Sequence, residues 1–243
     1  MSLLCEERLI SKKNKVYKRE YLIDGEKRRV IEKEFNYPNR YRVEKKVIEI
    51  LEHSVLAVPR LLPDKTPGQE KLSVLAYEYI EGITALDFIE QNGTLQCKYL
   101  LNEIIHWLAD YYLILEAVFK EQWILGDAHL RNFIYHQSSD TLYGFDFENA
   151  CPGRIEQDIA RLFLFIITYD PAYSPKHSAL AEYLIGNASQ AFSLDKAVLT
   201  QEINKEARDM ARRRGVYVDE LLLSLIVENN FKSYILHNDI QGW

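Results

Sequence analysis

The sequence is poor in cysteine and has no long apolar run. Cys5, Cys97 and Cys151 are the only cysteines among 243 residues, and their spacing fits neither a disulfide framework nor a metal motif. No apolar stretch approaches the roughly 20 residues that a transmembrane helix needs. Charged residues from Glu6 onward interrupt the N-terminal segment before a signal-peptide core forms. These absences argue against a disulfide-stapled secreted domain, so we expect free thiols, a cytoplasmic location and no transmembrane segment.

Positive charge is not in excess either. The chain has 30 lysines and arginines against 36 aspartates and glutamates, which gives a net charge of −6. This balance argues against a general nucleic-acid binder, so no nucleic-acid partner is expected. The hydrophobic fraction of 47% and the charged fraction of 27% are typical of a soluble globular protein. The length allows one large domain or two lobes, and the oligomeric state stays open.

Glycine is absent from the first turn of an alternating N-terminal segment. Apolar and polar residues alternate in three short runs, which predicts strands at Arg8–Ile10, Val16–Ile23 and Arg28–Phe35. Asp24-Gly25 joins the last two runs and is a strong hairpin-turn signal. The turn from Ser11 to Lys15 holds three lysines and no glycine. It is either a basic turn in solvent or a site where lysines contact an anion as point charges.

A lysine and a glutamate in the next segment have unusual positions. Lys33 shares one strand face with Ile31 and Phe35, because side chains alternate along a strand. Residues 40–51 are predicted to form a helix, and Glu44 lies beside its apolar stripe. Lys33 either has a partner there or extends to the strand edge, in which case Arg29 is the other candidate on that face. Glu44 faces either the sheet or solvent.

The composition of the chain changes after a fourth predicted strand. A buried strand is predicted from Leu72 to Ile80, and Glu81 and Gly82 follow it, so we expect one domain at residues 1–81 and a second at 82–243. The second domain is predicted to be helical, and His106 lies on the apolar stripe of its long helix and is expected to pack in the core. The arginines near residue 214 either face a helix C-terminus or bind an anionic partner. The predicted helices cover residues 84–91, 96–121, 159–168, 177–185, 195–214 and 219–236.

The most informative stretch runs from Gly126 to Glu148. Asp127 precedes Asn132 by five positions, and Asp146 follows on the returning strand of a hairpin predicted from Phe133–Tyr135 and Leu142–Phe147. Such a hairpin would bring the two aspartates and the asparagine together. Their oxygens suit Mg²⁺, and one carboxylate remains to accept a hydroxyl proton. The alternative is an ordinary hairpin whose Asp and Asn residues cap turns.

These motifs carry a resemblance to a known superfamily. Gly-Asp-x-His-x-x-Asn and Phe-Asp-Phe-Glu resemble the protein-kinase-like superfamily, and most of all its aminoglycoside/choline phosphotransferase branch. The small RIO-like and tRNA-modification-complex kinases and the lipopolysaccharide-core kinases are similar too. The resemblance implies an α+β, two-lobed fold with a small antiparallel-sheet N-lobe, a mostly helical C-lobe, and ATP with Mg²⁺ as cofactors.

The resemblance also implies roles for individual residues. Asp127 would be the catalytic base, with His129 and Asp158 supporting its loop, while Asn132 and Asp146 would hold Mg²⁺. Glu148 would either reach a second Mg²⁺ or lie at the surface. The nucleotide-binding set would comprise a lysine for the phosphates, the glutamate that holds it, a turn lysine and the backbone of the hinge: Lys33, Glu44, Lys13, Glu78 and Tyr79.

Three function classes follow from this resemblance. The first is an ATP- and Mg²⁺-dependent phosphotransferase acting on a hydroxyl of a small molecule or glycan. The second is a small atypical Ser/Thr protein kinase of the RIO-like or tRNA-modification-complex type, with a protein hydroxyl as acceptor. The third is a non-catalytic nucleotide-binding scaffold, which the set Asp127, Asn132 and Asp146 disfavours because a scaffold needs no proton acceptor. The short segment between Asp146 and Asp158 argues against phosphorylation-switched control of the usual protein-kinase type.

Overall fold

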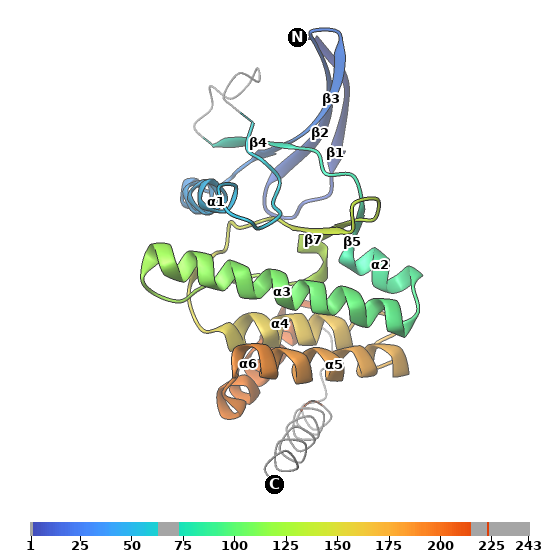
Figure 1. The fold of residues 1–243 in the computed structure, drawn as a ribbon, viewed down its shortest axis with the longest axis vertical. Helices are drawn as coiled ribbons and strands as arrows, with labels where there is room; N and C mark the ends of the chain where they lie inside the picture. The colour runs from blue at the N-terminus through green and yellow to red at the C-terminus, as the bar shows by residue number, and fades with distance from the viewer. Residues whose placement is uncertain (1, 63–72, 215–222, 224–243) are drawn as a thin grey trace. The chain divides into compact units, whose positions relative to one another are not determined.

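The structure is a computed structural model, and it describes residues 2–62, 73–214 and 223 (Figure 1). The chain divides into two compact units. The first contains Met1–Ile83 and Ile134–Ala150, and the second contains Thr84–Phe133 and Cys151–Trp243. The hairpin after the Asp127 segment therefore groups with the N-terminal part of the chain. The predicted domain boundary near Glu81 and Gly82 stays a prediction.

The first unit is built on a four-stranded antiparallel sheet. Its strands are β1 (Ser2–Leu9), β2 (Lys15–Ile23), β3 (Glu26–Glu34) and β4 (Val74–Glu78), in the spatial order β1-β2-β3-β4. The turn Asp24-Gly25 has positive φ angles of 52° and 84°, which a two-residue hairpin turn between twisted strands requires. The predicted sheet and this turn are confirmed.

β1 is longer than the sequence pattern predicted. It begins at Ser2 rather than Arg8 and pairs with β2 from Ser2↔Leu22 to Leu9↔Val16. The prediction was too short because nearly all of β1 is exposed, so no apolar alternation marks it. β1 forms because it pairs with β2, and its own sequence shows little sign of that pairing.

The two faces of the sheet bury different side chains. Val30 of β3 packs with Tyr21 and Ala76 on one face. Lys33, at odd spacing from Val30, points to the other face. The helix α1 (Pro38–Leu51) begins with proline in its first turn and buries Glu44 together with its apolar residues.

The hairpin of the first unit is β7 (Phe133–His136) and β8 (Thr141–Gly144), and β5 (Ile83–Thr84) pairs with β7. The returning strand ends at Gly144, whereas the sequence predicted it to reach Phe147. Asp146 therefore lies beyond the strand and not on it. It has a φ of 66°, and this left-handed conformation ends regular strand geometry.

The second unit is helical. Its helices are α2 (Ala85–Gln91), α3 (Thr94–Phe119), α4 (Ile155–Ile167), α5 (Pro175–Phe192) and α6 (Lys196–Arg214). α5 packs against α3 and α4, and α6 packs against α4 (Figure 1). The α+β class, with an antiparallel sheet in the N-terminal part and mostly helices later, is confirmed. The helix predicted at 219–236 falls outside the described residues except for Leu223.

α3 supplies much of the core of the second unit. Trp107 stacks on Tyr111 and meets Phe133 edge-on, with ring centroids 5.5 Å apart in both pairs. His106 was expected in this core, but its side chain is 76% exposed. The apolar stripe is wide enough to bury Trp107 and leave its polar neighbour in solvent. Among the described residues no helix is both long and apolar enough to cross a membrane, and the three cysteines are free.

Candidate active site

A buried aspartate of α4 fixes the backbone of the segment Leu125–Asp127. Asp158 accepts hydrogen bonds from the N–H groups of Leu125, at 2.7 Å, and Gly126, at 3.0 Å. The hydroxyl of Tyr112 donates to the same carboxylate at 3.1 Å. Gly126 has a φ of 69°, a conformation that glycine adopts without strain. The structure thus gives Asp158 contacts with the backbone of this segment, as the resemblance implied, and its place in the catalytic set stays a prediction.

Burial raises the pKa of Asp158 to about 6, and its hydrogen bonds from Leu125, Tyr112 and Gly126 oppose that rise. The carboxyl group is only 1% exposed, so water cannot stabilise its charge. A raised carboxyl pKa means that the folded protein holds this proton more tightly than the unfolded chain does. The stability that Asp158 contributes is therefore fully present below pH 3.8 and is lost as the pH rises through about 6.

This titration gives a first testable prediction. We expect the stability advantage of the wild type over Asp158→Asn to shrink by roughly 2 kcal/mol between pH 4 and pH 7, since one pKa unit corresponds to about 1.4 kcal/mol and part of the effect is already lost at pH 4. Chemical denaturation of both proteins across that range measures the difference, and the comparison cancels the groups they share. An advantage that stays constant or grows with pH would contradict the raised pKa.

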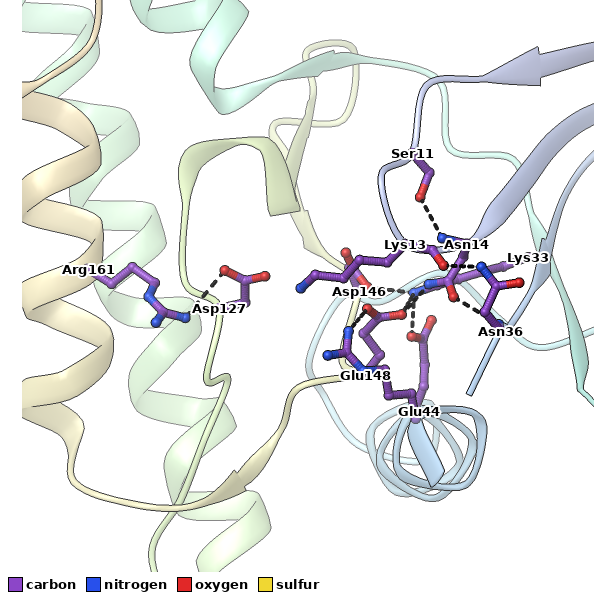
Figure 2. A network of polar contacts seen from close by, with 11 residues as sticks. Ser11, Lys13, Asn14, Lys33, Asn36, Glu44, Asp127, Asp146, Glu148 and Arg161 are labelled. Atoms are coloured by element: carbon purple, nitrogen blue, oxygen red, sulfur yellow. Dashed lines mark hydrogen bonds and ion pairs between the residues drawn. The ribbon is translucent and has the colours of Figure 1, made fainter. Parts of the chain in front are cut away.

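Asp127 lies beside an arginine of α4. Arg161 Nη1 is 3.3 Å from Asp127 Oδ1, and the same nitrogen donates to the backbone oxygen of Gly126 (Figure 2). Arg161 Nη2 contacts Glu206 Oε2 at 2.9 Å. Burial opposes the charge of Arg161, but Glu206 and Asp127 outweigh it, and the pKa of Arg161 is raised. The guanidinium is a permanent cation at the edge of the candidate site.

Asn132 and His129 shape the loop after Asp127. The Asn132 amide nitrogen donates to the backbone oxygen of Asp127 at 2.9 Å, and its backbone N–H donates to the oxygen of His129 at 3.0 Å. This leaves the amide oxygen of Asn132 as its available metal donor. The His129 ring packs against Phe165 of α4, with centroids 5.1 Å apart. His129 therefore supports the loop through packing, and its assignment to the catalytic set stays a prediction.

In the first unit, Lys33 lies among three carboxylates. Its Nζ is 2.6 Å from Glu44 Oε2, 2.5 Å from Asp146 Oδ1 and 3.1 Å from Glu148 Oε2 (Figure 2). The predicted pairing of Lys33 with Glu44 is thus present in the structure. Asp146 makes its contact from a left-handed backbone conformation. That the cluster faces a nucleotide stays a prediction.

Burial and charge act against each other in this cluster. Burial lowers the pKa of Lys33, but the three carboxylates outweigh it and the pKa is raised, so the amine is charged. Burial raises the pKa of Glu44 to about 7, and Lys33 opposes that rise. The hydroxyl of Tyr77 donates to Glu44 Oε1 at 2.6 Å, which satisfies the second oxygen of this buried carboxylate.

Glu148 is a buried member of the cluster and not a surface acid, since it is only 4% exposed. One oxygen contacts Lys33 and accepts from the amide of Asn14, while the other is 2.8 Å from Arg40 Nη1. Asn14 belongs to the glycine-free turn before β2, and its amide oxygen accepts the N–H of Asn36 at 3.3 Å. Hydrogen bonds of the Asn14 side chain therefore hold this turn, which contains no glycine.

The acidic side chains offer a place for a divalent cation. Carboxylate oxygens of Glu44, Asp146 and Glu148 lie within 4.8 Å of one another. Hard oxygen donors of this kind suit Mg²⁺. Asp146 is the most accessible of the three, with one third of its side chain exposed. The donor set therefore fits a magnesium ion bound to Asp146, with Lys33 compensating the remaining charge.

The other predicted nucleotide contacts lie in the first unit as well. The N–H groups of Glu78 and Tyr79 donate to the backbone oxygens of Arg60, at 3.0 Å, and Arg29, at 3.3 Å. Arg29 lies over the Tyr79 ring and pairs with Glu81. Lys33, and not the alternative candidate Arg29, therefore pairs with Glu44.

Lys13 is exposed, and its backbone oxygen accepts from Asn36 at 2.5 Å. Its side chain therefore does not share in the burial of the neighbouring Asn14. The contact with phosphate that the resemblance implies for Lys13 stays a prediction, as do the adenine contacts of the hinge residues.

Two solved structures resemble this chain over most of its length. An aminoglycoside phosphotransferase-like protein from Ralstonia eutropha JMP134 is 14% identical, with a TM-score of 0.52, over 99% of this chain and 85% of that one. WaaP in complex with acyl carrier protein is also 14% identical, with a TM-score of 0.52, over 84% of this chain and 88% of that one. The chain has the protein-kinase-like fold. No protein-family model and no curated protein sequence matches it.

Three side chains that contact predicted residues, one in the second unit and two in the first, were missed at the level of the sequence. Arg161 beside Asp127, Tyr77 on Glu44 and Arg40 on Glu148 were not predicted. The spacing of Arg161 from Asp158 is a usable signal, since residues three apart share a helix face. Tyr77 and Arg40 reach the cluster from other elements, and no short-range pattern connects them to it.

Proposed function

We propose that the chain is an ATP- and Mg²⁺-dependent phosphotransferase that acts on a hydroxyl group of a small molecule or glycan. The observation that carries this proposal is the buried cluster of Lys33 with Glu44 and Asp146. A buried lysine held by one carboxylate and close to a second, partly exposed one can bind phosphate oxygens next to a metal ion. The kinase-like fold supports this reading.

Each residue then has a defined task. Lys33, oriented by Glu44, binds phosphate oxygens of ATP, and Asp146 would hold Mg²⁺, which would supply positive charge beside those oxygens. Asp127 orients the acceptor hydroxyl and takes its proton. The acceptor oxygen forms a bond to the γ-phosphorus while the bond from that phosphorus to the bridging β,γ-oxygen breaks, so ADP leaves and the phosphorylated acceptor remains.

A hydroxyl of a protein is the second candidate acceptor. Only eleven residues separate Asp146 from Asp158, and they contain β9 (Cys151–Pro152) and the first residues of α4. This leaves no room for the long activation segment of conventional protein kinases, which favours a small-molecule acceptor. Small atypical protein kinases lack that segment as well, so the acceptor screen described in the Discussion includes proteins.

Metal-dependent nucleotide binding tests this proposal. We expect Mg²⁺ to strengthen ATP binding at least about 10-fold in the wild type, because Asp146 would hold the metal and the metal would offset the phosphate charge. In Asp146→Asn, which keeps the left-handed backbone accessible, most of that gain should disappear. Isothermal calorimetry with and without Mg²⁺ measures both affinities.

Asp140 provides a matched control. It lies in the turn between β7 and β8 with a φ of 51°, is exposed, and accepts a hydrogen bond from the hydroxyl of Tyr135. Asp140→Asn should retain the full effect of Mg²⁺. Equal ATP affinity with and without Mg²⁺ in the wild-type protein would contradict the proposed function.

A further inference from the structure

α4 carries a second residue that holds the segment around Asp127. Arg161 lies one helical turn after Asp158, so the two side chains share one face of α4. Asp158 accepts the N–H groups of Leu125 and Gly126, whereas Arg161 donates to the oxygen of Gly126 and contacts Asp127. One turn of helix therefore holds both the donor and the acceptor groups of this short segment.

Arg161 is itself held by α6. Its Nη2 is 2.9 Å from Glu206 Oε2, and the other oxygen of Glu206 accepts from Arg213 Nη2 at 2.5 Å. Glu206 is buried, so its carboxylate depends on these two arginines to compensate its charge. A planar guanidinium presents several donors in a fixed fork, so binding at one nitrogen orients the others. Glu206 thereby sets the direction in which Arg161 points toward Asp127.

We propose that Arg161, oriented by Glu206, is a positioning residue that fixes the Asp127 carboxylate for proton acceptance. This inference rests on the proposed function, in which Asp127 takes the proton of the acceptor hydroxyl. The contact engages Oδ1 of Asp127.

The need for such a partner follows from the aspartate side chain. The terminal torsion of aspartate has a broad energy minimum, so an unrestrained carboxylate samples many orientations. Proton transfer requires the accepting oxygen within hydrogen-bond reach of the hydroxyl. A misplacement of about 1 Å costs on the order of 100-fold in rate. The contact of Arg161 with Asp127 restricts the orientation of this carboxylate before the substrate binds, which limits that loss of rate. We call this contact the arginine clamp.

Substitution of Arg161 is the first test. We expect Arg161→Met to lower the rate of ADP formation from Mg²⁺-ATP, with water as acceptor, about 10- to 100-fold. The KM for ATP should stay within about twofold, because the clamp acts on the base and not on the nucleotide. Arg161→Lys keeps the charge but offers a single point donor, so its rate should fall between that of the wild type and that of Arg161→Met. Glu206→Gln should lower the rate less than Arg161→Met does.

A double-mutant cycle decides whether Arg161 acts through Asp127. Residues that act as one unit give non-additive effects, so Arg161→Met should cause no further loss in an Asp127→Asn background. The residual rate is followed with γ-labelled ATP. If Arg161→Met slows Asp127→Asn by the same factor as the wild type, or leaves the wild-type rate unchanged, the positioning role is wrong.

Two comparisons keep this inference separate from the proposed function. If Asp127→Asn retains the full wild-type rate, the base assignment fails, and the clamp has nothing to position. If Asp127→Asn is slow but the cycle is additive, only the role of Arg161 fails. Arg212→Met is the matched control on α6, since Arg212 makes a similar 3.3 Å pair with Asp209 at the surface. Its rate should equal the wild type, and thermal melting should confirm that each variant is folded.

Discussion

Asp127→Asn is expected to lower turnover by about two to four orders of magnitude, the usual contribution of a general base. Asparagine keeps the shape of the side chain but cannot take the hydroxyl proton. ATP affinity should be nearly unchanged, because phosphates and metal are assigned to Lys33 and Asp146. Stability should change little, since Asp158 and Asn132 hold the loop through its backbone. Steady-state rates and calorimetric ATP affinity measure the two effects separately.

Other outcomes for Asp127→Asn have distinct meanings. Turnover equal to that of the wild type would show that Asp127 is not the base. Loss of ATP binding or of folding would make Asp127 a structural residue instead. Asp110→Asn is a suitable control, because Asp110 is an exposed aspartate on α3, outside the Asp127 segment.

Lys33→Met is expected to lower both the stability of the protein and its affinity for ATP. It removes the cation that contacts Glu44, Asp146 and Glu148, and breaking a buried ion pair from one side costs about 3–5 kcal/mol. It also removes a charged donor to phosphate, which should weaken ATP binding about 10- to 100-fold. Chemical denaturation and calorimetry measure the free energy of unfolding and the ATP affinity.

A double variant separates the two effects of Lys33. Lys33→Met with Glu44→Gln removes one of the stranded charges, so part of the lost stability should return while ATP affinity stays low. Lys15→Met on β2 is the control, since Lys15 pairs with Glu34 in a half-exposed position. Restored ATP affinity in the double variant, or wild-type affinity in Lys33→Met, would show that Lys33 does not bind the nucleotide.

The sequence predicted the features that depend on local periodicity. Strand alternation placed Lys33 on the face of Ile31 and Phe35, and the helix stripe allowed Glu44 to face the sheet. The resemblance implied that the two side chains pair, and the structure contains that pair. Asp24-Gly25 specified its own turn, because few other dipeptides adopt two positive φ angles cheaply. The resemblance implied that Asp158 supports the loop around Asp127, and the contacts of Asp158 with the backbone of Leu125 and Gly126 agree with it.

Features that depend on partners distant in sequence were not predictable. β1 is exposed and exists through pairing with β2, so its sequence shows no strand pattern beyond the last residues. Glu148 is buried because Asn14, Lys33 and Arg40 converge on it from three separate elements. Arg161 gains its role from Asp127 and Glu206, which lie 34 and 45 residues away along the chain. Such contacts arise from tertiary packing, which short windows of sequence do not contain.

Transfer of the γ-phosphoryl group is the measurement that tests the central claim most directly. γ-Labelled ATP and Mg²⁺ are incubated with the wild type and with Asp127→Asn against sugars, aminoglycosides, choline and generic proteins, and labelled product is quantified. We predict label on a hydroxyl of one small-molecule or glycan class, at least about 100-fold faster with the wild type than with Asp127→Asn. Label transferred equally fast by both proteins, or no transfer and no ADP formation by a wild type that binds Mg²⁺-ATP, would contradict a phosphotransferase that uses Asp127 as its base.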